Sequence, residues 1–350
     1  MQKAINSKEL TSILETFNIQ KINQNRNYWL FRTSSNKYFE EFYINNFIAL
    51  GDQNFDIYDK IDLNIIQNFK KNNIIEKIRK YNLRDNNLND AINYVNIFVN
   101  QMKQGDIILL SNKYSNHIAF GELLEDDVYQ IDENEYQKLY KKKRCYYRKR
   151  RKLKWYKCDN KNKLDLYIHK LLNSHYKITS ANEYAHYIDR SLHDLFIKND
   201  EAYIVFRVWH KEKILATDVI EFIENILNSI DIYNEYFQDN LKKNEIDLKL
   251  NIQSPGPIEF SGDIYTCLII ALIIIGIFGG KFSFEFTKDK QKAEVGTKGL
   301  LGRLIEIMKL MNSNDKQIKD FKETTKKAAE KLNVKPPKIN KEDDENIMKN

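Results

Sequence analysis

Basic side chains gather in one short stretch of this sequence, and aromatic side chains lie among them. Between Lys141 and Lys154 the chain reads KKKRCYYRKRRKLK, and Trp155 follows directly. Lysine and arginine neutralise the phosphates of a nucleic-acid backbone, while aromatic rings stack on its bases. The stretch therefore points to a polyanion as the natural ligand. The candidate phosphate-binding residues are Lys143, Arg144, Arg148, Arg150, Arg151, Lys152 and Lys154.

The spacing of these cations matters if residues 150–157 form a strand. Side chains alternate between the two faces of a strand, so Arg150, Lys152 and Lys154 would share one face and Arg151 would join Trp155 on the other. Cations two residues apart along a strand are about 7 Å apart, a spacing that can follow phosphates along a backbone. Two alternatives stay open: an ordinary solvated basic loop, or a strip that lies against an anionic membrane surface.

No catalytic motif accompanies the cations. The sequence has no HExxH, Walker A, GxSxG or paired CxxC motif. His186 and His193 are seven residues apart and would share a helical face, but this spacing favours a partly buried polar face over a metal site. Glu212 and Lys213 follow a strand pattern without the preceding Asp of a restriction-type nuclease. We therefore expect no catalytic residue, no metal and no cofactor.

The composition indicates a chain that is mostly globular. It has 350 residues, 42% of them hydrophobic and 30% charged, which is enough for two domains with separate cores. The formal net charge of +7 is modest, so its concentration in one stretch is more informative than its size. Three cysteines without metal-site or disulfide spacing, and an N-terminus without a secretory pattern, predict a cytoplasmic protein.

In the first half of the chain, short apolar runs must position the candidate residues. Residues 1–25 have helical spacing and predict a leading helix. Strands are expected at residues 28–32, 47–51, 107–110, 117–123 and 150–157, with a short helix over 38–46 and two helical blocks within 61–104.

These segments, in this order, resemble a known family. The carrying residues are YWLFRTSSNKYFEEFYINNFIALG at 28–51, MKQGDIILL at 102–110, HIAFGEL at 117–123 and YYRKRRKLKW at 146–155. They resemble the EVE-like members of the PUA superfamily that are fused to the N-terminus of Mrr-type restriction proteins. Arg151, Leu153 and Trp155 fill the last motif, whereas Thr33 to Asn36 stand where the family has a glycine-rich turn.

The resemblance implies a small β-barrel over residues 26–158 with one aromatic-lined pocket, in a family that senses modified bases in DNA or RNA. A flipped base recovers its unstacking cost through stacking and through hydrogen bonds to its edge. Trp29, Tyr38 and Trp155 could supply stacking faces, and Arg32 a forked donor or phosphate clamp. The alternative is that Trp29 and Trp155 are core residues of the barrel.

After a polar break at residues 159–163 the pattern changes, and residues 164–311 predict an α+β domain. We expect helix over 164–198, a strand at 203–210, a helix at 217–230 capped by Thr217 or Asp218, a strand that stops at Pro255-Gly256, a strand at 281–286 and a helix at 299–311. Residues 312–350 are highly charged and predict a solvated helix followed by a disordered tail.

The apolar segment 264–280 has seventeen residues without a charge and predicts one very apolar helix. This length is the lower limit for a bilayer span, so the segment is either a buried core helix or a membrane anchor. The residues SPGPIEFSG that precede it, 254–262, resemble a short motif of proteins from bacterial immune loci, in which an effector part follows a sensor part.

The sequence thus predicts an α+β protein, a PUA/EVE-like barrel followed by an α+β domain. Its expected function is to sense nucleic acid, with or without a modified base, within a bacterial anti-phage defence or restriction system. The C-terminal domain would then self-associate or bind a partner protein. Two alternatives remain: a membrane-anchored effector triggered by a nucleotide ligand, with residues 264–280 in the inner membrane, and a divergent nuclease.

Overall fold

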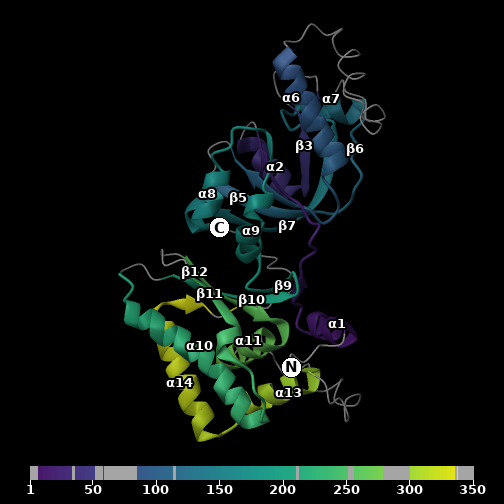
Figure 1. Ribbon diagram of the computed structural model, residues 1–350. Coiled ribbons are helices and arrows are strands. Elements are labelled where there is room, and N and C mark those ends of the chain that lie inside the picture. Colours follow the sequence, from purple (N-terminus) through teal and green to yellow (C-terminus); the bar gives the residue numbers. More distant parts are fainter. Residues whose placement is uncertain are drawn as a thin grey trace. The chain divides into compact units, whose positions relative to one another are not determined.

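The computed structural model divides the chain into two compact units (Figure 1). It describes residues 7–33, 36–51, 58, 85–112, 116–209, 213–250, 256–278, 300–335 and 337. One unit, which we call the inserted unit, comprises residues 25–192; the other, the outer unit, comprises residues 1–24 and 193–350. The fold is mixed α+β, as predicted. The first domain was expected to cover residues 26–158 and the second to begin at residue 164, whereas the inserted unit extends to residue 192.

The inserted unit is built on a curled sheet with the strand order β3-β7-β5-β4-β2-β8, and β6 also pairs with β7. The strands are β2 (Tyr28–Arg32), β3 (Phe47–Leu50), β4 (Ile107–Ser111), β5 (His117–Leu123), β6 (Tyr129–Gln130), β7 (Lys149–Asn160) and β8 (Ile178–Ser180). Strand β2 runs parallel to β4, and the other pairs along this path are antiparallel. The five strands predicted in this region are confirmed.

Strand β7 causes the curl because it pairs with different strands along its two halves. Residues 149–152 pair with β3, whereas residues 153–160 pair with β5. Among the described strands, the ends of the path, β3 and β8, do not pair with each other. The sheet is therefore a half-barrel rather than the closed barrel that was expected.

Helices complete the inserted unit on both sides of the sheet. They are α2 (Asn36–Ile44), α6 (Asp85–Asn96) with a π-helical turn (Ile97–Gln101), α7 (Glu133–Lys141), α8 (Leu166–Leu171) and α9 (Ala185–Leu192). Ile168, Leu171 and Ile188 are buried against Leu30 and Phe120 of the sheet. This burial explains why the unit continues to residue 192 and does not end at the polar break after residue 158.

The outer unit is a second sheet with the order β1-β9-β10-β12-β11, and β13 also pairs with β10. Its strands are β1 (Gln20–Lys21), β9 (Leu195–Lys198), β10 (Glu201–Val208), β11 (Ile246–Leu250), β12 (Gly256–Asp263) and β13 (Val334–Lys335). Its helices are α1 (Ser7–Thr16), α10 (Ala216–Phe237), α11 (Ile264–Phe278), α13 (Leu300–Met311) and α14 (Lys316–Lys331). Figure 1 shows α10, α11, α13 and α14 gathered on one side of this sheet.

Several expectations for residues 164–311 are wrong. Residues 164–198 include two strands besides helices, β8 of the inserted unit and β9 of the outer unit. Strand β12 begins at Gly256, where the preceding strand was expected to stop. Helix α10 begins after Leu215, which gives no side-chain cap, so neither Thr217 nor Asp218 is the N-cap. The expected strand at 281–286 and the tail from residue 338 lie outside the described residues.

The two terminal helices belong to the core of the outer unit. Helix α1 is not a separate leader, because Ile13 is fully buried in the same cluster as the sheet. Helix α14 buries Ile318, Phe321 and Ala328 on one face, so it is not the solvated helix that its charge suggested.

Helix α11 covers fifteen residues of the apolar segment and is buried along most of its length. It packs against α10, α13 and the strands β10 and β12. In the described part of the chain, no helix is both long and apolar enough to cross a membrane.

Candidate nucleic-acid interface

A small pocket opens where β2 ends, between α2 and the residues that follow β3. Its empty space, the mouth included, is about 200 Å³. The lining combines aromatic rings with two cations and has no carboxylate. The lining residues are Phe31, Arg32, Thr33, Tyr38, Phe42, Ala49, Gly51, Tyr147 and Lys177.

Arg32, the last residue of β2, brings a positive charge to this pocket. Its Nη1 donates to the carbonyl oxygens of Leu172 at 2.9 Å and Ser174 at 2.8 Å, which fixes the guanidinium. Burial lowers the pKa of Arg32. No carboxylate among the described residues forms an ion pair with this guanidinium, so its charge is not compensated there.

Lys177 supplies the second cation of the lining and is a neighbour of Arg32, whose amide donates to the Lys177 carbonyl oxygen at 2.9 Å. Its Nζ donates to the carbonyl oxygen of Gly51 at 2.6 Å and lies 5.0 Å from the centre of the Tyr58 ring. Gly51 is required here because a Cβ at this position would overlap the ring of Tyr147. The pocket therefore needs glycine at position 51, where the backbone itself packs against the ring of Tyr147.

Of the four residues predicted to form a base pocket, Arg32 and Tyr38 line this pocket and the two tryptophans do not. Tyr38 is buried, with its ring 5.3 Å from that of Tyr147. Trp29 is a core residue whose Nε1 donates to Asp106 Oδ2 at 2.9 Å. Trp155 is partly buried, and its Nε1 donates to the carbonyl oxygen of Phe42 at 3.2 Å. The alternative reading of the tryptophans as core residues fits their positions.

The strand β7 does not carry the expected row of outward cations, because its first half is buried. Arg150 donates to the carbonyl oxygens of Tyr147 at 2.9 Å and Cys145 at 2.7 Å, and its guanidinium lies over the ring of Phe47. The preceding Lys149 is also fully buried. Arg150 therefore cannot reach a phosphate together with Lys152 and Lys154, which are exposed.

Arg151 is likewise fully buried, with no exposed surface. Its Nη1 donates to the carbonyl oxygens of Phe98 at 2.9 Å and Met102 at 2.7 Å, and its Nη2 to those of Glu125 at 2.7 Å and Asp126 at 3.0 Å. This guanidinium holds two loops against β7, so the assignment of Arg151 to phosphate binding is wrong.

Four further exposed cations follow one another at the end of α7 and in the turn after it, residues Lys141 to Arg144, which we call the basic turn. Lys143 has a left-handed backbone with φ of 54°. Arg144 Nε lies 3.2 Å from Glu41 Oε1, and the amide of Cys145 donates to Glu41 Oε2 at 2.9 Å. Glu41 belongs to α2, the helix that also carries Tyr38 of the pocket. Arg148, further along, pairs with Glu133.

Four tyrosines connect the basic turn with the pocket, and we call them the tyrosine row. The ring centres of Tyr140 and Tyr146 are 5.2 Å apart, those of Tyr146 and Tyr147 are 5.5 Å apart, and Tyr147 leads to Tyr38 at 5.3 Å. Tyr140 at one end of the row is 56% exposed, whereas Tyr147 and Tyr38 at the other end are buried. Tyr140 was not singled out from the sequence, although its position just before the cations was a usable signal.

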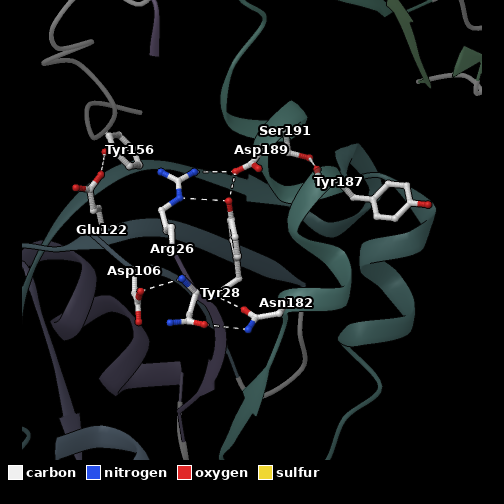
Figure 2. A network of polar contacts seen from close by, with 10 residues as sticks. Arg26, Tyr28, Asp106, Glu122, Tyr156, Asn182, Tyr187, Asp189 and Ser191 are labelled. Atoms are coloured by element: carbon white, nitrogen blue, oxygen red, sulfur yellow. Dashed lines mark hydrogen bonds and ion pairs between the residues drawn. The ribbon is translucent and has the colours of Figure 1, made fainter. Parts of the chain in front are cut away.

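A polar network at the other end of β2 joins the two ends of the inserted unit (Figure 2). Asp189 Oδ1 accepts from Arg26 Nη2 at 2.7 Å and from the Tyr28 hydroxyl at 2.6 Å. Burial and the neighbouring Asp189 raise the pKa of the Tyr28 phenol, so it stays a donor. Asn182 accepts from the Tyr28 amide at 2.8 Å. These groups satisfy one another and act as a structural clasp.

Among the described residues, no three or more His, Cys, Asp or Glu side chains form a cluster that could hold a metal ion. The two histidines considered above belong to different units, since His186 precedes the boundary at residue 192 and His193 follows it.

Residues 27–179 match a family described as a domain of unknown function, DUF8426, and this range covers most of the inserted unit. No curated protein matches the chain, and no solved structure does.

Proposed function

We propose that the inserted unit reads nucleic acid, with one base or nucleotide group in the pocket and the backbone phosphates on the basic turn. The observation that carries this proposal is the pocket lining, which combines Tyr38 and Tyr147 with Arg32 and Lys177 and has no carboxylate. Such a lining favours a flat ligand rich in hydrogen-bond acceptors. The half-barrel and the resemblance to EVE-like PUA domains support the same function.

The arrangement of the neighbouring surface also supports it. Phosphate contacts position a nucleic acid, whereas contacts to a base give specificity. The basic turn and the pocket are joined through α2 by Glu41 and through the tyrosine row. A single strand of nucleic acid whose phosphates contact Lys142 and Lys143 could stack one base on the exposed ring of Tyr140. Because the pocket is small, entry of a base requires a lining side chain to move, and Lys177 has the most flexible stem.

In this proposal the outer unit responds to the bound nucleic acid, as part of a bacterial defence or restriction system. The resemblance to the barrels of Mrr-type restriction proteins and the segment SPGPIEFSG support this context. DNA and RNA, with or without a modified base, are the ligands to be compared.

The experiment is a binding titration of the full-length protein with labelled single-stranded DNA and RNA oligonucleotides, with and without one modified pyrimidine. Arg32→Gln should reduce the discrimination between bases and leave the salt dependence unchanged, because it acts in the pocket. Tyr140→Ala should weaken binding to every sequence by about 1–3 kcal/mol, the value of one stacked base. Lys163→Ser, an exposed lysine on another segment, is the control. Unchanged affinity and discrimination in both variants would refute the proposal.

A further inference from the structure

Strand β11 forms an edge of the sheet in the outer unit. It pairs with β12 on one side, and among the described strands none pairs with its other side. Asp247, Leu248, Lys249 and Leu250 are all exposed, Leu248 by 39% and Leu250 by 42%. Proteins usually protect such edges with proline, bulges or several charges, since an open edge offers unpaired backbone groups to another strand. The regular register of β11 with β12 includes neither a proline nor a bulge, and the two charges of β11, on Asp247 and Lys249, are of opposite sign.

The sequence of β11 is complementary to itself in the antiparallel direction. If Leu248 lies opposite Leu248 of a second copy, Asp247 lies opposite Lys249 and Ile246 opposite Leu250, twice in each dimer. Residues directly opposite each other share a face, so both charged pairs lie on one face and the apolar pairs on the other. Opposite charges in these positions are favourable, and any shift by one residue would place charges against leucines.

The faces also agree with the rest of the sheet. Leu248 lies opposite Phe260 of β12 and Leu250 opposite Ile258, and both of these β12 residues are buried in the core of the outer unit. The apolar face of a β11–β11 pair would therefore continue the core face of each sheet. The charged face of the pair would continue the opposite face of each sheet, on which Lys249 of β11 lies 3.7 Å from Glu259 of β12.

We propose that β11 pairs with β11 of a second copy of this chain, across a two-fold axis at Leu248, and joins two sheets into one. A two-fold contact of this kind uses the same patch on both subunits. Five residues from each chain make a small interface, so we expect a dimer that dissociates at roughly micromolar concentrations. This proposal does not depend on the proposed binding of nucleic acid.

Cysteine cross-linking of the full-length protein tests the register. Directly opposed residues in an antiparallel pair have Cα atoms about 4.5–5.5 Å apart, within the range that a disulfide can span. Leu248→Cys should therefore form a disulfide-linked dimer under mild oxidation. Leu250→Cys is the matched control, because the two copies of residue 250 would be about 13 Å apart along the strands. Equal cross-linking of the two variants, or none in either, would overturn the proposal.

Sedimentation velocity over a concentration series tests the dimer without new cysteines. The wild-type protein should form dimers as its concentration rises, and Asp247→Lys should abolish them because two Lys–Lys pairs replace two ion pairs. Glu224→Lys makes the same change of charge on the exposed side of α10 and should leave the dimer intact. A wild-type monomer at every concentration, or equal loss of the dimer in both variants, would contradict the pairing.

Discussion

At the scale of single residues, the largest effect on stability is expected from Arg151. Its buried guanidinium donates to four backbone carbonyls, so Arg151→Ala would leave buried acceptors without donors. We expect a loss of about 3 kcal/mol or more in the free energy of unfolding of the inserted unit. Chemical denaturation followed by fluorescence measures it.

The neighbouring Lys152 is the control for this prediction. It is exposed and pairs with Glu125 at the surface, so Lys152→Ala should leave the unfolding midpoint close to that of the wild type. Arg151→Lys keeps the charge but lacks the forked donors, and it should restore only part of the stability. Equal effects of Arg151→Ala and Lys152→Ala would show that the buried clamp has no special role.

The thiol of Cys158 gives a prediction about pH. Burial and the nearby Asp159 raise the pKa of Cys158 to about 11. Because the thiolate is the reactive form, labelling of Cys158 should become about tenfold faster for each pH unit between pH 8 and 10, without levelling off. Mass spectrometry identifies the modified cysteine. A rate that reaches a plateau near pH 9, as for an ordinary thiol, would contradict this shift.

The residue scale is also where prediction from the sequence was least reliable. Strand periodicity correctly placed Lys152 and Lys154 on the exposed face of β7 and Arg151 on the other face. It could not show that the first half of β7 is covered on both faces, because the covering segments, such as Tyr147 and Phe98, are distant in the sequence or lie in irregular turns. The same limit applies to Trp29, whose ring nitrogen is satisfied by Asp106, 77 residues further along the chain.

At the scale of elements, the pairing of β5 with β7 depends on Gly121. The register shifts between Phe120 and Gly121, and a Cβ on Gly121 would lie 2.5 Å from the ring of Trp155. Gly121→Ala should therefore displace Trp155 and shift the tryptophan emission spectrum. Gly105→Ala is the control, since it has φ of 84° with open space around it and should cost about 1 kcal/mol without moving Trp155. An unchanged spectrum for Gly121→Ala would contradict this packing.

Helix α14 gives a second prediction at this scale. Deletion of residues 316–350 would uncover the core of the outer unit, because Ile318, Phe321 and Ala328 are buried there. We expect the outer unit to become sensitive to proteolysis while the inserted unit stays resistant. Resistance of the outer unit after this deletion would show that α14 is not part of its core.

Elements were predicted better than residues because local patterns determine them. The five predicted strands of the first half follow from short apolar runs, and the helix at 300–311 follows from helical spacing. Several strands were missed, among them β8, β9, β12 and β13. They are short or follow turn residues, so their pairing partners rather than their own patterns define them. The many charged residues of α14 concealed its apolar face, which becomes visible when residues 316–331 are placed at helical spacing.

At the scale of the whole molecule, the chain places residues 25–192 as an insertion within the outer unit. The inserted unit has two cores of its own, and Arg26, Tyr28 and Asp189 join its ends. We expect residues 25–192 to fold when expressed alone, with a cooperative melting transition. Asp189→Asn should lower its melting temperature, since it removes the charge that pairs with Arg26. Failure of the isolated unit to fold would mean that the clasp needs the outer unit.

The claim that matters most is that the basic turn binds nucleic acid. Its most direct test is the affinity of the full-length protein for a single-stranded oligonucleotide, measured at several salt concentrations for the wild type and for Lys142→Ser/Lys143→Ser. The proposal predicts weaker binding by the variant and a smaller salt slope, by about one unit for each lost phosphate contact. No binding by the wild-type protein, or the same affinity and slope in the variant, would contradict it.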